Sequence, residues 1–174
     1  MLELGTDHQN HLMDNMKSKV ILLFGRICSG KTSYKPNSYR VVVSNLVRAV
    51  IADYAPTATR DQLQDTMHLD NKIAESIIMV TDYAVNIYKH PEVIIDGIRQ
   101  VSIVEKVLEK YPDAELVWLE VPEEERKRRY ESRGDAKDVE PFDIADNKNI
   151  ELECQKIFST FKDKLTIINN YGIN

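Results

Sequence analysis

Eight consecutive residues, Gly25 to Thr32, have the types and spacing of a phosphate-binding loop. They read Gly-Arg-Ile-Cys-Ser-Gly-Lys-Thr, so four residues separate the two glycines and Lys-Thr follows the second. Glycines let a backbone curve so closely that successive N–H groups point at a polyphosphate. In such a loop Lys31 reaches the β- and γ-phosphates, and the Thr32 hydroxyl binds Mg²⁺. The segment therefore predicts that the chain binds a nucleoside triphosphate.

The residues before the loop strengthen this prediction. Val20 to Phe24 form an apolar run that is typical of a buried strand, and the loop begins directly after it. The alternative, a Gly/Ser turn with an exposed lysine, does not explain that strand. The residues expected to hold the phosphates are Gly25, Arg26, Ile27, Cys28, Ser29, Gly30, Lys31 and Thr32.

A second apolar run ends in an acid. Val93 to Ile95 are followed by Asp96 and Gly97, as expected for a strand that ends in a carboxylate near the loop. We expect Asp96 to bind Mg²⁺ or to accept a proton from a substrate, the alternative being a structural cap. Asp61 and Asp138 are weaker candidates for the base.

A basic cluster follows the segment Pro122-Glu123-Glu124-Glu125. It contains Arg126-Lys127-Arg128-Arg129 and, four residues further, Arg133. Phosphoryl transfer depends on positioning and on neutralising charge, which arginines supply. The alternative is a solvated helix face with Glu–Arg pairs. We hold the two interpretations equal for residues 126–128 and favour a role in transfer for Arg129 and Arg133.

Strands and helices are expected to alternate along the chain, which favours a parallel sheet covered on both faces. Pro36 limits the helix after the loop to little more than one turn. Strands are expected at 20–24, 40–44, 93–97, 114–121 and 165–168, and helices at 45–51, 60–89, 101–110, from 122 onward and at 143–161.

Two further segments resemble adenylate-kinase-like enzymes. Val-Pro-Glu-Glu-Glu-Arg-Lys-Arg-Arg-Tyr-Glu-Ser-Arg-Gly resembles the entry to their lid helix, where two arginines hold the phosphates being exchanged. The matching residues are Arg129 and Arg133. Arg48 resembles the arginine that binds the acceptor. The resemblance implies an α/β P-loop NTPase fold of the nucleoside monophosphate kinase type, with a five-stranded parallel sheet and helices on both faces.

The segment Asp96-Gly97-Ile98-Arg99 resembles the Asp-Gly-x-x-Arg segment of the same enzymes, although the arginine comes one residue earlier. It implies that Arg99 binds substrate and offsets charge during transfer. The catalytic residues implied in this way, together with the loop lysine, are Lys31, Asp96, Arg99, Arg129 and Arg133; Arg48 and Arg99 would bind substrate, and Thr32 and Asp96 the metal.

Residues 17–142 also resemble a narrower group, the phage kinases that phosphorylate 5-hydroxymethyl-2′-deoxyuridine within DNA during thymine hypermodification. The segments Asp-Gly-Ile-Arg-Gln and Trp-Leu-Glu-Val-Pro carry most of this likeness. The resemblance implies ATP and Mg²⁺ as cofactors and DNA containing 5-hydroxymethyluracil as acceptor. A hydroxymethyl alcohol, unlike a monophosphate, benefits from a positioned base, for which Asp96 is the best candidate.

Two other functions remain open. A deoxynucleoside monophosphate kinase, or another small-molecule kinase of the same fold, would enclose its acceptor in a helical subdomain, which residues 60–89 could supply. A non-catalytic nucleotide sensor would keep the loop but has little use for Arg99, Arg129 and Arg133.

The composition indicates the location of the protein in the cell and says little about the reaction. The 174 residues carry a formal net charge of −5 and two cysteines, and no apolar run approaches the length of a membrane span. We therefore expect a cytoplasmic protein without a membrane partner. Residues 1–16 are expected to be a disordered leader, with Met16 as an alternative start. Residues 17–174 are expected to form one P-loop kinase domain with a short lid around 129–142.

Overall fold

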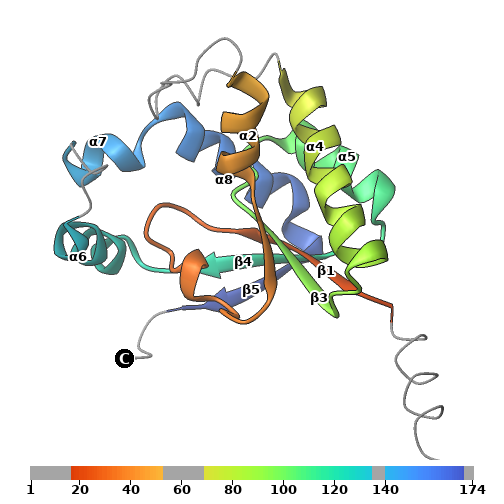
Figure 1. The fold of residues 1–174 in the computed structure, drawn as a ribbon. Coiled ribbons are helices and arrows are strands. Elements are labelled where there is room, and N and C mark those ends of the chain that lie inside the picture. Colours follow the sequence, from red (N-terminus) through yellow and green to blue (C-terminus); the bar gives the residue numbers. More distant parts are fainter. Residues whose placement is uncertain (1–16, 53–68, 135–139, 171–174) are drawn as a thin grey trace, which may run out of the picture.

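A computed structural model describes residues 17–52, 69–134 and 140–170. Five parallel strands form one sheet in the order β2-β3-β1-β4-β5 (Figure 1). The predicted α/β fold with a five-stranded parallel sheet is confirmed. The strands are β1 (Lys19–Phe24), β2 (Tyr39–Val42), β3 (Glu92–Asp96), β4 (Glu115–Glu120) and β5 (Leu165–Asn169). The expected leader lies outside the described residues.

Helices and short helical turns connect these strands. The α-helices are α2 (Val43–Ile51), α4 (Asp70–Asp82), α5 (Val101–Lys110), α6 (Glu123–Arg133), α7 (Phe142–Asp146) and α8 (Asn149–Phe161). Two 3₁₀ turns, η1 (Lys31–Ser33) and η4 (Lys162–Lys164), and one π-helical turn, η3 (Tyr83–Ile87), complete the described elements. None of the helices in the described ranges is long and apolar enough to cross a membrane.

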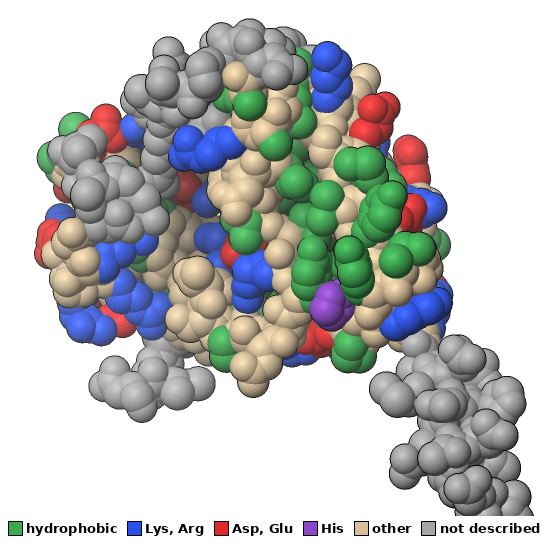
Figure 2. Space-filling view, in the orientation of Figure 1, with side chains coloured by type: hydrophobic (Ala, Val, Ile, Leu, Met, Phe, Trp, Pro, Cys, Tyr) green, Lys and Arg blue, Asp and Glu red, His purple; other side chains and the backbone are tan. Residues whose placement is uncertain are grey.

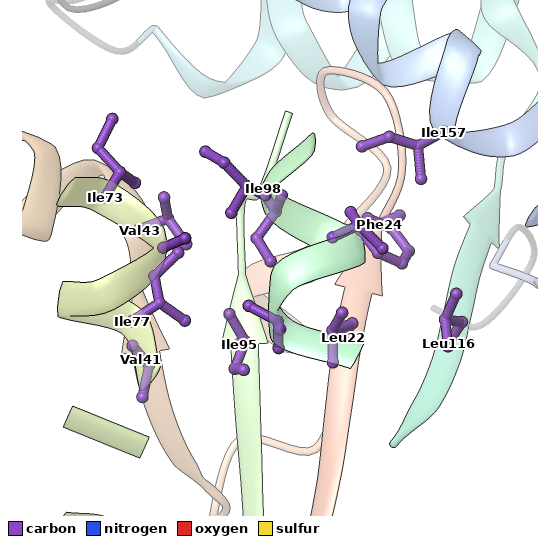
Figure 3. Close-up of a cluster of buried hydrophobic side chains, with 14 of the residues drawn as sticks. Leu22, Phe24, Val41, Val43, Ile73, Ile77, Ile95, Ile98, Leu116 and Ile157 are labelled. Carbon is purple, nitrogen blue, oxygen red and sulfur yellow. The ribbon is translucent and has the colours of Figure 1, made fainter. Parts of the chain in front are cut away.

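The two faces of the sheet are covered unequally. One face and the helices α2, α4, α5 and α8 share a single large apolar core, part of which is shown in Figure 3. Leu22 and Ile95 of the sheet lie there with Ile77 of α4 and Ile157 of α8, all fully buried. This face therefore supplies most of the hydrophobic stabilisation.

The apolar core on the opposite face is smaller. Among the residues that the structure describes, it consists of Ile21, Leu23, Ile94, Val117 and Leu119, against which Tyr34 and Ile168 pack. Tyr34 directly follows η1, so the segment after the phosphate loop covers this face where a long helix would otherwise lie. The short helix predicted after the loop is confirmed as this three-residue turn.

The boundary between the second strand and the helix that follows it differs from the prediction. The second strand ends at Val42 and passes directly into α2, so Ser44 lies inside the helix and does not cap it. Val43, Val47 and Ile51 are buried at helical spacing, which outweighs the strand preference of the β-branched run.

The long helix expected over 60–89 is described only from Asp70. Ile73, Ile77 and Ala84 are buried at helical spacing, but Ile87 is 65% exposed. The π-helical turn η3 adds a residue to the helical turn and so rotates Ile87 away from the core. Figure 2 shows hydrophobic side chains gathered over this part of the surface.

The helix expected over 143–161 is two helices. The chain is extended at Lys148, between α7 and α8. Asn147 Nδ2 donates to the carbonyl of Asp143 at 2.8 Å and thereby closes the end of α7. The break matters because it places Asp146 and Glu151 against the phosphate loop.

Candidate active site

The predicted phosphate loop joins β1 to η1 at the carboxyl edge of the sheet. Gly25 has φ +147° and Gly30 has φ +85°, both in the region that favours glycine. A Cβ on Gly25 would lie 2.4 Å from Ser29 Oγ, and one on Gly30 would lie 2.4 Å from Asn170 Nδ2. Both glycines are therefore required by backbone conformation and by close packing.

Lys31 folds back over this loop. Its Nζ donates to the carbonyl oxygens of Gly25 at 2.6 Å and Arg26 at 3.1 Å. Burial, reinforced by the positive charge of Arg99, lowers the pKa of the Lys31 ammonium to about 8. Both bonds go to neutral carbonyls, so an anionic phosphate oxygen would be a stronger partner for this ammonium.

Asp96 lies beside the loop because β1 and β3 are paired in register. Leu23 is opposite Asp96, one residue before the strand gives way to the loop. The carboxylate forms an ion pair with Arg40 of β2, with 3.0 Å between Nη1 and Oδ2. Arg40 also donates to the carbonyl of Tyr34 at 2.5 Å. Asp96 is thus held at the sheet edge by Arg40.

Thr32 and Asp96, the two residues predicted to bind the metal, suit a Mg²⁺ ion that keeps several water ligands. The side chain of Thr32 is exposed at the start of η1, and the residues that the structure describes contain no cluster of three or more metal-binding side chains. Mg²⁺ is commonly bound by one or two protein ligands together with substrate phosphates and water. Thr32 and Asp96 suit that mode better than a closed protein cage.

Arg129 of α6 lies over the phosphate loop. Its Nη1 is 3.4 Å from the carbonyl oxygen of Cys28, and its Nη2 donates to the carbonyl of Asn170 at 2.8 Å. Glu125, one turn earlier, accepts from Nε at 2.7 Å. The side chain of Asn170 in turn donates to the Ser29 carbonyl at 2.8 Å. Arg129 therefore lies against the loop at Cys28, and Asn170 contacts both Arg129 and the loop.

The remaining predicted arginines lie in three different places. Arg99 lies against the buried Glu151, with 3.0 Å between Nη1 and Oε1. Arg133 is exposed on α6, with its guanidinium 5.3 Å from the centre of the Tyr130 ring. Arg48 is exposed on α2. Of this predicted set, the structure brings Arg99 and Arg129 to the loop, whereas Arg48 and Arg133 lie on helix surfaces. Figure 2 shows Lys and Arg side chains on both sides of a hollow in this face.

The expected lid falls only partly in the described residues. Residues 135–139, which include Asp138, lie outside them, as does Asp61. The described part is closely packed: the Tyr130 hydroxyl donates to the Glu140 carbonyl at 2.8 Å, and Tyr130 and Phe142 pack edge to face. Ile27 of the loop belongs to the same apolar cluster.

The sequence analysis did not predict the contacts that several residues make around the loop. Arg126 is only 3% exposed and pairs with Asp146, so it is no solvated arginine. Glu151 occupies a position on the apolar stripe of α8, with Cys154 and Ile157. An acid on a buried stripe was the available signal for Glu151. Asn170, which follows the last strand, offered no such signal.

Comparisons with known proteins agree on the architecture. No protein-family profile matches the chain, and no curated sequence matches it. Among solved structures, a sugar kinase from Janibacter sp. HTCC2649 is similar, with a TM-score of 0.53 and 14% identity over 90% of this chain and 87% of that one. A gluconokinase from Sinorhizobium meliloti 1021 has a TM-score of 0.48 and 13% identity over 91% of this chain and 85% of that one.

The chain therefore shares its α/β fold with the sugar kinase. Identity this low shows a shared architecture and no more, so the reaction has to be inferred from the site itself.

Proposed function

We propose that this protein is an ATP- and Mg²⁺-dependent kinase that transfers the γ-phosphoryl group to a hydroxyl acceptor. The observation that carries the proposal is the convergence of Lys31 and Arg129 on one glycine-shaped loop, with Asp96 at the neighbouring strand end. A protein that only binds nucleotide has little use for a second cation aimed at the phosphates.

Each residue then has a distinct task. The loop amides and Lys31 would hold the donor phosphates, with Lys31 leaving the Gly25 and Arg26 carbonyls as it does so. Thr32 and Asp96 would bind Mg²⁺, which offsets charge on the phosphates. Arg129 would stabilise the charge that develops on the transferring group. Arg99 would add positive charge from beneath the loop, and Arg133 and Arg48 would reach the site from helix surfaces.

The acceptor proposed is the hydroxymethyl group of 5-hydroxymethyl-2′-deoxyuridine in phage DNA. The sequence resemblance over residues 17–142 supports it, and the carboxylate of Asp96, at the strand end beside the loop, would accept a proton from the alcohol. A base in duplex DNA would have to leave the stack to reach this site. The Lys and Arg side chains around the hollow in Figure 2 would then contact the DNA backbone. A cytoplasmic location would give such an enzyme its ATP and DNA.

A second candidate is a kinase acting on a small molecule. The structural neighbour described as a sugar kinase favours a free alcohol as the small acceptor, and a deoxynucleoside monophosphate remains the other. All three acceptors would use the same donor site, and the three proposals differ only in the molecule that receives the phosphoryl group.

Phosphate transfer from γ-labelled ATP tests these alternatives in parallel. The acceptors are duplex DNA containing 5-hydroxymethyluracil, matched thymine DNA, a panel of nucleoside monophosphates and a panel of sugars including gluconate. Label on the hydroxymethylated duplex alone supports the leading proposal. Label only on a monophosphate or a sugar overturns the DNA acceptor and keeps the kinase, and no label on any acceptor contradicts the proposed transfer. Lys31→Ala provides the background.

A further inference from the structure

The phosphate loop lacks the support that a long helix would give it. The helical turn η1 starts within the loop at Lys31 and ends at Ser33, and the chain becomes extended at Tyr34. A three-residue turn contributes little dipole and few fixed N–H groups. Other parts of the molecule must therefore hold the backbone of the loop in shape.

Glu151 of α8 holds one loop residue from behind. Its Oε2 accepts the main-chain N–H of Ile27 at 3.0 Å, and the side chain is almost fully buried. Arg99 supplies the counter-charge at 3.0 Å from Oε1. Burial disfavours the charged carboxylate, but Arg99 and Lys31 outweigh burial and keep the pKa of Glu151 below its usual range. One amide of the loop thus points away from the phosphate side, toward a fixed anion.

Asp146 of α7 holds the neighbouring loop residue. Its Oδ2 lies 2.7 Å from Nη2 of Arg26, and its main-chain carbonyl accepts from the same nitrogen at 2.9 Å. Arg126 of α6 binds both carboxylate oxygens of Asp146, and both of these side chains are 3% exposed. Asp146 therefore joins the loop to the helix that carries Arg129.

The two acids form one arrangement. They come from either side of the break between α7 and α8, and they engage consecutive loop residues, Arg26 and Ile27. Each acid is also paired with an arginine outside the loop, Asp146 with Arg126 and Glu151 with Arg99, so neither charge is buried alone, which would be costly. Tyr130 and Phe142 pack against each other and share an apolar cluster with Ile27.

We propose that Asp146 and Glu151 are positioning residues that shape the phosphate loop for nucleotide, in place of the missing helix. The proposal rests on the proposed function only in requiring that ATP binds this loop, and it does not depend on the acceptor. It assigns the break between α7 and α8 a role in nucleotide binding. The alternative is that the two acids only stabilise the fold.

Glu151→Gln and Asp146→Asn test the proposal, because each keeps the shape of the side chain and removes its charge. We expect the dissociation constant for Mg²⁺-ATP, measured by calorimetry on the full chain, to rise roughly 10- to 100-fold, as for loss of a hydrogen bond to a charged group. Asp143→Asn on α7 and Glu153→Gln on α8 are matched controls, since both acids form surface ion pairs, and they should bind ATP as the wild type does.

Thermal unfolding without nucleotide separates the two roles. The positioning role is wrong if Glu151→Gln and Asp146→Asn bind ATP with an affinity within twofold of wild type. It is also wrong if their affinity for ATP is lower only in samples that have partly unfolded. Glu151→Asp adds a graded test: it keeps the charge but shortens the reach to Ile27, so it should recover part of the affinity lost in Glu151→Gln.

Hydrogen exchange of the wild-type protein gives a test that needs no variant. The Ile27 amide should be protected without nucleotide and unchanged by ATP, while loop amides facing the phosphates gain protection. A large gain at Ile27 would mean that this amide faces the phosphates and would overturn the proposal. ATP binding without transfer to any acceptor would refute the kinase function and leave this inference standing. A wild type that binds no ATP would refute both.

Discussion

The two sides of the phosphate loop contrast in chemistry. Behind the loop, Asp146 and Glu151 are buried acids, each paired with an arginine. In front of it, Lys31 and Arg129 are cations whose contacts to the loop go to main-chain carbonyls. Charge on the back is balanced by buried ion pairs, whereas on the front Lys31 contacts only uncharged groups in its hydrogen bonds to the loop, and Arg129 pairs with Glu125 through Nε while its other nitrogens contact carbonyls.

This difference separates the residues that hold the loop, Asp146 and Glu151, from those that would act on a ligand, Lys31 and Arg129. Paired buried charges are costly to rearrange, so the back is expected to keep its geometry when nucleotide binds. A carbonyl oxygen is a weaker acceptor than a phosphate oxygen, so Lys31 and Arg129 can exchange partners at a gain. The following predictions test that division, from the largest expected effect to the smallest.

Lys31→Ala should reduce phosphoryl transfer to background. The variant removes the ammonium that reaches the donor phosphates, while the loop stays bound to Asp146 and Glu151 from behind. Transfer of label from γ-labelled ATP measures the loss, and circular dichroism should show an unchanged fold. Retention of more than a few per cent of the wild-type turnover would place the donor site elsewhere.

Arg129→Ala should lower kcat by roughly a hundredfold, the scale seen when one charge-stabilising donor is removed. Arg128→Ala is the matched control: Arg128 is exposed and pairs with Glu125, so its loss should change kcat less than twofold. Arg133→Ala should fall between them. If the double variant Arg129→Ala/Arg133→Ala turns over at the wild-type rate, the assignment of α6 to the transfer site is wrong.

The affinity for ATP should fall as the pH rises through about 8. Burial and Arg99 lower the pKa of Lys31 to about 8 in the protein without nucleotide, so the ammonium is present below that pH and is lost above it. Each further pH unit should weaken binding up to about tenfold. Titration calorimetry between pH 7 and 9.5 measures the slope. Lys31→Arg keeps its charge over this range, so its affinity, whatever its size, should not show the decline.

Asn170→Ala should weaken ATP binding by only a few-fold. Asn170 binds the Ser29 carbonyl through its side chain, whereas it binds Arg129 through its main-chain carbonyl, which the variant keeps. The measurement is the dissociation constant for Mg²⁺-ATP. A loss as large as that of Glu151→Gln would show that the front of the loop also depends on fixed side-chain bonds, and the contrast between the two sides would disappear.

Local signals were enough to predict the strands and the loop from the sequence. The apolar run before Gly25 and the short helix imposed by Pro36 depend on neighbours in the chain, and the structure confirms both. The early start of α2 at Val43 was missed because β-branched residues suit a strand and a buried helix face alike.

The back of the loop was beyond local reasoning. The sequence left Arg126 equally open to a solvated position and to a role in transfer, and only the packing of α6 against α7 shows that it is buried with Asp146. The same limit applies to Arg40, whose pairing with Asp96 joins β2 to β3. Ion pairs between distant segments leave no periodic pattern in a sequence, so their partners appear only once the fold is known.

The partners of the phosphate loop are also the last described parts of the chain to be synthesised. Asp146 and Glu151 follow their loop residues by 120 and 124 positions, and Asn170 follows Ser29 by 141. At roughly 5–20 residues per second on the ribosome, the loop waits on the order of 10 s for them. A nascent chain should therefore acquire nucleotide binding only after residues 146–170 have emerged, which would make ATP a late ligand and no aid to the early folding of the loop.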